Sequence, residues 1–138
     1  MVAGGEVPVE LSDFWLSEVG DQIICQVELY PVILLKQKLG SRLARRRVCW
    51  YIDNDPARDG LIAGASGSSS SRALLYQFAR LQHTEPSYNW FARVPSFSNC
   101  SDDPSRGRGL VFAQSVGAKF EAGWTMDAET IALLKVSC

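Results

Sequence analysis

The segment 22–54 constrains the fold of this chain most, because a helical pattern is followed at once by a strand pattern. It reads QIICQVELYPVILLKQKLGSRLARRRVCWYIDN. Apolar side chains at the spacing i, i+4, i+7 and i+11 predict a helix over about 21–39, with one face formed by Ile23, Val27, Tyr30 and Leu34. The continuous β-prone run 47–52 is typical of a strand covered on both faces.

Two carboxylates in this segment lack an obvious structural role. Glu28 lies among apolar neighbours, where a carboxylate is unfavourable unless it is paired, protonated or bound to metal; alternatively, it reaches solvent at the edge of the stripe. Asp53 ends the strand pattern, and open α/β sheets bind ligands at the carboxyl ends of their strands. Asp55 can cap the next helix with Pro56 at its first position. Asp53 is therefore free for another role, unless it is an ordinary turn aspartate.

A third carboxylate comes from the segment 99–107, NCSDDPSRG. Asp103 can cap a short helix that starts at Pro104, which leaves Asp102 without a structural role. We interpret Glu28, Asp53 and Asp102 as a metal-binding cluster at one end of the sheet. Their carboxyl groups should then lie within about 10 Å of one another, because such ions bind oxygen at about 2.0–2.6 Å.

The remaining patterns are shorter. They predict an edge strand at 7–11, helices at 56–63, 71–83 and 127–136, the last capped by Asp127, a connector at 64–71, and strands at 88–95 and 110–116.

Composition excludes several classes of protein. The 138 residues suit one domain, and the net charge of −1 gives no overall attraction to nucleic acid or membrane. No apolar run approaches membrane-spanning length, so we expect no membrane partner. Four cysteines without a CxxC pair and a single histidine argue against zinc and against a hydrolase triad. Cys25 and Cys49 read as buried thiols in a reducing compartment, which indicates an intracellular protein, cytoplasmic or nuclear.

Three segments together resemble the ribonuclease H-like domain attached to reverse transcriptases of retroelements. They are QVELYPVILL at 26–35, RRVCWYIDNDPARDGLI at 46–62 and WFARVPSFSNCSDDPSRG at 90–107. The resemblance implies an α/β fold, a ribonuclease H-like mixed sheet flanked by helices. It places a partial domain at 1–108, with a C-terminal extension at 109–138 that contains a short helix.

The same resemblance implies a function. Glu28, Asp53 and Asp102 would be catalytic and would bind Mg²⁺ or Mn²⁺ in a two-metal hydrolase of the RNA strand of RNA–DNA hybrids. The family's first aspartate, on the first strand, has no match here. The domain is therefore expected to be N-terminally incomplete, a remnant that is weakly active or inactive. Contacts to the hybrid or to other nucleic acid would come from Arg45, Arg46, Arg47, Asn54, Arg93 and Arg106.

Two alternatives stay open at this point. The chain could be a non-catalytic nucleic-acid-binding or assembly module of the same fold, using the arginines above and Arg108. It could also be an unrelated small α/β domain whose carboxylates are turn residues. If the chain has the ribonuclease H fold, the strand at 47–53 lacks one neighbouring strand. We then expect either marginal stability or a gap filled by 6–12, by 110–116, by a second copy or by an upstream polyprotein segment.

Overall fold

Helix α2, Ile24–Leu43, is the element around which the others are arranged in the computed structural model, which describes residues 1–100 and 104–135. The helix continues through Pro31 and past Gly40, so the predicted end at residue 39 was too early. Gly40 is buried, and a Cβ at this position would overlap the carboxylate of Glu85. The glycine therefore permits close packing here and does not stop the helix.

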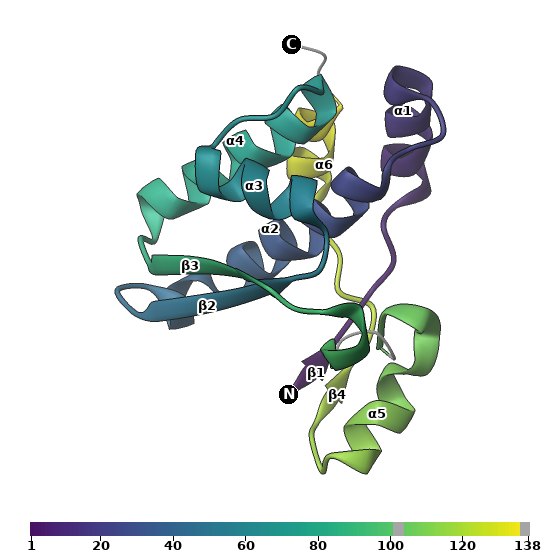
Figure 1. Cartoon of the computed structure of the whole chain (residues 1–138), viewed down its shortest axis with the longest axis vertical. Helices are drawn as coiled ribbons and strands as arrows, with labels where there is room; N and C mark the ends of the chain where they lie inside the picture. Colours follow the sequence, from purple (N-terminus) through teal and green to yellow (C-terminus); the bar gives the residue numbers. More distant parts are fainter. Residues whose placement is uncertain (101–103, 136–138) are drawn as a thin grey trace.

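A parallel pair of strands lies against this helix. β2, Arg47–Ile52, pairs with β3, Tyr88–Arg93, in a register that runs from Arg47 opposite Tyr88 to Ile52 opposite Arg93. The crossover between the strands consists of α3, Asp55–Ala63, and α4, Ser69–Thr84. Figure 1 shows α2, α3, α4 and α6, Ala128–Leu134, gathered beside the two strands. The predicted α/β class and the helix capped by Asp127 are confirmed, since Thr130 N donates to Asp127 Oδ1 at 2.7 Å.

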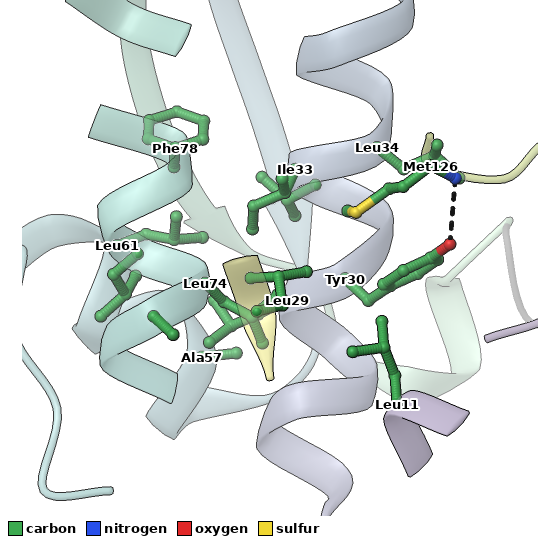
Figure 2. Packing of buried hydrophobic residues seen from close by; sticks show 14 of the residues in the cluster. Leu11, Leu29, Tyr30, Ile33, Leu34, Ala57, Leu61, Leu74, Phe78 and Met126 are labelled. Atoms are coloured by element: carbon green, nitrogen blue, oxygen red, sulfur yellow. Dashed lines mark hydrogen bonds between the residues drawn. The ribbon is translucent and has the colours of Figure 1, made fainter. Parts of the chain in front are cut away.

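The core lies between α2 and α4. Leu29 and Ile33 of α2 are fully buried and face Leu74 and Phe78 of α4 (Figure 2). On the other side of α2, the backbone N–H of Met126 donates to the hydroxyl of Tyr30 at 3.4 Å, which fixes the segment that leads into α6. Full burial of one large aliphatic side chain contributes about 1.5–3 kcal/mol. This interface is therefore the main source of stability.

A second parallel sheet is much smaller. β1, Val2–Ala3, pairs with β4, Phe120–Glu121, and α5, Gly109–Ser115, lies beside them (Figure 1). The ring of Phe120 lies so close to Gly109 that a Cβ there would overlap it. The short turns η1, Ser96–Ser98, and η2, Pro104–Arg108, lie between β3 and α5. The predicted mixed sheet is thus wrong for the part of the chain that the structure describes, which forms two separate two-stranded sheets.

Two predicted strands are helices. The alternation at 7–11 belongs to α1, Val9–Val19, which buries Leu11 and Trp15, one helical turn apart. The carboxylate of Glu18 in α1 accepts from the backbone N–H of Ser70 at 2.9 Å and from the hydroxyl of Ser69, and so ties α1 to the start of α4. The predicted strand at 110–116 is α5. Neither segment fills the place beside β2.

The strand β2 was predicted to be covered on both faces, and this is wrong. Trp50 and Ile52 are buried, whereas the alternate residues Arg47, Cys49 and Tyr51 are exposed. Cys49 is therefore not a buried thiol, and Cys25 is only partly buried. Within residues 1–100 and 104–135, no helix has the length and apolar character needed to cross a membrane.

Candidate carboxylate site

Glu28 and Asp53 meet at the carboxyl end of β2. Glu28 lies on α2 and Asp53 follows the last residue of β2, and the two carboxyl groups lie close enough for Asp53 to perturb the ionisation of Glu28. Both side chains are half-buried. The sequence predicted this meeting, because one residue lies in an apolar helix and the other ends an apolar strand. The pair brings two acidic groups to one point.

Burial, together with the neighbouring Asp53, raises the pKa of Glu28 above its ordinary value of 4.5. Burial disfavours the charged carboxylate, and the second acidic group disfavours it further by repulsion and by hydrogen bonding to the protonated form. Two carboxylates in contact favour either a shared proton or a bound cation. This electrostatic arrangement is common to acid–base sites and metal sites.

Asn99 belongs to the same site. Its amide Nδ2 donates to Asp53 Oδ2 at 3.0 Å, which holds the turn after β3 against the end of β2. Asn99 belongs to the segment 99–107 that was noted in the sequence, but it was not predicted to have a role in the site. Its position three residues before Asp102 was the available signal. Asp102 itself lies outside the described residues, so its predicted place in the cluster stays a prediction.

The donor set partly suits a divalent cation. Mg²⁺ and Mn²⁺ prefer oxygen ligands, which Glu28, Asp53 and the amide oxygen of Asn99 can supply. Among residues 1–100 and 104–135, no group of three acidic, cysteine or histidine side chains is close enough to hold a metal ion. The two carboxylates therefore fit one weakly held cation, and water molecules would complete its coordination.

The predicted nucleic-acid contacts do not form one patch. Arg45, Arg46 and Arg47 are exposed at the start of β2, at least about 20 Å of extended chain away from Asp53. Arg93 lies at the carboxyl end of β3 and pairs with Asp55 at 3.3 Å.

The other two predicted contacts differ from one another. Asn54 Oδ1 accepts from Ala57 N at 2.9 Å and so caps α3, a role that the sequence had assigned to Asp55. Arg106 is exposed in η2, and its predicted contact with nucleic acid is not tested.

The exposed face of the larger sheet was not predicted as a site. Tyr51, Tyr88 and Trp90 are 68%, 72% and 71% exposed. In the observed register Arg47 faces Tyr88, and Cys49 faces Trp90, on the surface opposite the buried Trp50. The alternation of Tyr88 and Trp90 along the strand was visible in the sequence. Their exposure was not visible, because it depends on which segments cover the sheet.

The carboxylate pair is separate from an open groove elsewhere on the surface. That open groove, with a volume of about 460 Å³, lies between the C-terminal half of α2 and the segment after β4 and contains none of the predicted site residues; it is lined by Met1, Lys38, Leu39, Arg42, Glu121, Gly123, Trp124 and Thr125. Comparisons with protein-family models, with curated proteins and with solved structures find no match to this chain.

Proposed function

We propose that this chain is a ribonuclease H-like remnant of a retroelement reverse transcriptase, with a two-carboxylate site that binds one divalent cation weakly. The contact between Glu28 and Asp53 at the carboxyl end of β2 carries the proposal. The parallel β2–β3 pair, joined through two helices, supports it, as does the bond from Asn99 to Asp53. The substrate class would be RNA–DNA hybrids.

The residues of this site explain why activity should be low. In two-metal hydrolysis the cations activate water and stabilise the leaving oxygen, and the protein orients them with several carboxylates. Glu28 and Asp53 supply two carboxylates, and Asp102 is the expected third. The family's first aspartate, which would complete a set of four carboxylates, has no counterpart in the sequence. We therefore expect weak or undetectable cleavage with Mg²⁺ or Mn²⁺.

Cleavage of a labelled RNA–DNA hybrid tests this proposal. Any activity of the unmodified chain should be slow, should require Mg²⁺ or Mn²⁺, and should disappear in Asp53→Asn. The matched control is Asp13→Asn, because Asp13 is an exposed carboxylate on α1. Robust metal-dependent cleavage would contradict the expected loss of activity. Slow cleavage that Asp53→Asn leaves unchanged would remove Asp53 from the site.

A specific observation favours a second function, a non-catalytic nucleic-acid-binding module. Aromatic side chains on an exposed sheet face can stack on unpaired bases, and nearby arginines attract the phosphates. Tyr51, Tyr88 and Trp90 lie on such a face, and Arg45–Arg47 lie at its edge.

The second function predicts salt-dependent binding of single-stranded oligonucleotides. Trp90→Ala should weaken binding by about 1–3 kcal/mol, the stacking contribution of one base. Tyr76→Ala is the control, since Tyr76 is an exposed aromatic residue on α4. Fluorescence anisotropy of labelled oligonucleotides measures both variants. An equal loss in both, or no binding at low salt, would reject the stacking face.

A further inference from the structure

The outer edge of β2 has no partner strand among the residues that the structure describes. On its other edge, Tyr88 N donates to Arg46 O at 2.8 Å and Val94 N donates to Ile52 O at 3.3 Å. Backbone groups of successive residues point to opposite edges of a strand, so those of Arg47, Cys49 and Tyr51 point outward. An unpaired edge of this length is a template for another strand.

The far edge of β3 is less suited to such pairing. β3 lies between β2 and the helices of the crossover, and it contacts α3 (Figure 1). Pro86 and Pro95 flank it, and proline cannot donate to a ladder. The inner edge of β3 is already paired with β2. The outer edge of β2 is therefore the better place for strand addition.

The charges along β2 favour a second copy of the same strand. Arg45, Arg46 and Arg47 are exposed at its start and make no ion pair with a described residue. Asp53 and Asp55 follow its end. In an antiparallel pair of identical strands, the basic start of each copy lies against the acidic end of the other. Twofold symmetry makes both ends complementary at once.

The exposed face limits the register. A twofold axis perpendicular to the sheet keeps the exposed faces of both copies on the same side. The side chains on that face of β2 are the odd-numbered ones, so odd-numbered residues of one copy must lie opposite odd-numbered residues of the other. With the axis at Trp50, Arg47 lies opposite Asp53 of the second copy, and Cys49 lies opposite its Tyr51. In this register the outward-pointing backbone groups of the two copies can hydrogen-bond to each other. The basic Arg47 of each copy then lies directly opposite the acidic Asp53 of the other.

We propose that two copies of this chain associate through the outer edges of β2, antiparallel about Trp50, to form one four-stranded sheet. The inference goes beyond the proposed function but shares Asp53 with the proposed cation site, so association is measured without divalent cations. One ladder of about seven residues from each copy buries less than the roughly 1,000 Å² of a stable interface, so the dimer should be weak, with dissociation in the micromolar range.

Sedimentation equilibrium in reducing buffer, from about 5 to about 500 µM, tests the proposal across that range of affinity. The average mass should rise from the 15.2 kDa of one chain towards twice that value. Arg47→Asp and Asp53→Lys should each weaken association at least about tenfold, because each makes both ends of the interface repulsive. An equimolar mixture of the two variants should regain association, because the mixed dimer again places opposite charges at each end.

Two substitutions of Cys49 separate edge pairing from other contacts. Cys49→Ser should leave association unchanged, since no disulfide is involved. Cys49→Pro removes an outward N–H that β3 does not use, and it should abolish association while circular dichroism shows the fold retained. A chain that stays monomeric at the highest concentration would overturn the proposal, as would a variant mixture no more associated than its components. Association that appears only when an oligonucleotide is added would also overturn it.

Discussion

The two parallel sheets of this protein differ in what holds them together. The β2–β3 sheet has six residue pairs, and α2 and α4 cover its inner face. The β1–β4 sheet has two pairs, extended by backbone bonds from Val2 to Lys119 at 2.7 Å and from Gly4 to Glu121 at 3.0 Å. Two strands alone are marginally stable unless a helix packs on them. Stability should therefore depend on the α2–α4 core and only weakly on the small sheet.

The largest loss is expected when the core behind the larger sheet is opened. Ile33→Ala removes a fully buried side chain between α2 and α4 and should lower the free energy of unfolding by about 3 kcal/mol. Urea unfolding followed by circular dichroism measures the change. A loss below about 1 kcal/mol would mean that the α2–α4 interface is not the main core.

The second largest loss in the free energy of unfolding is expected at a buried lysine. Lys36 is fully buried and donates to Glu85 O at 2.7 Å and to Ser87 Oγ at 2.8 Å, which holds the turn before β3 against α2. Lys36→Met leaves both acceptors without this donor and should lower the free energy of unfolding by about 2 kcal/mol. Lys38→Met, at an exposed position two residues later, should change it by less than about 0.5 kcal/mol. Equal effects in the two variants would contradict this role of Lys36.

The small sheet should respond less. Phe120 is only partly buried and packs on Gly109, so Phe120→Ala should lower the free energy of unfolding by about 1 kcal/mol. The β2–β3 sheet shares no ladder with β1 or β4, so any stacking of nucleic acid on Trp90 should be unaffected. The same urea and anisotropy measurements apply. A loss as large as that of Ile33→Ala would show that the two sheets form one cooperative core.

The smallest effect has the opposite sign and depends on pH. The pKa of Glu28 is raised on folding, so its stabilising contribution is full below 4.5 and is lost as pH rises through the raised value. Glu28→Gln should therefore unfold at higher urea than the unmodified chain at pH 7, by roughly 0.5–1 kcal/mol for a partly exposed pair. The difference should vanish near pH 4. A stabilisation that stays constant between these pH values would not come from this ionisation.

Patterns that lie within one element were predicted well from the sequence. The apolar spacing predicted a helix over about 21–39, which is α2, and the predicted strands at 47–52 and 88–95 correspond to β2 and β3, the second of which ends at Arg93. Glu28 in that helix and Asp53 after that strand were predicted to lie close together. The helix and the strands were predicted from residues close together in the chain. The carboxylate pair also required the rule that open α/β sheets bind ligands at the carboxyl ends of their strands.

Features that depend on distant segments were not predicted. The five residues at 7–11 fit a strand, and the helical face appears only when Trp15 is included. Gly109 and Ala113 are the buried residues of α5, and their small side chains give a weak helical signal at 110–116. Cys49 and Tyr51 are exposed because none of the segments within 1–100 and 104–135 covers that face of β2, and the strand's own sequence does not encode this.

The central claim is that the contact between Glu28 and Asp53 is a cation site, and thermal unfolding with and without Mg²⁺ or Mn²⁺ tests it most directly. An ion at about ten times its dissociation constant stabilises the folded chain by about 1.4 kcal/mol, which raises Tm by roughly 4 °C. The unmodified chain and Asp13→Asn should show this rise, and Glu28→Gln and Asp53→Asn should not. No rise in any form, or an equal rise in all four, would contradict the claim.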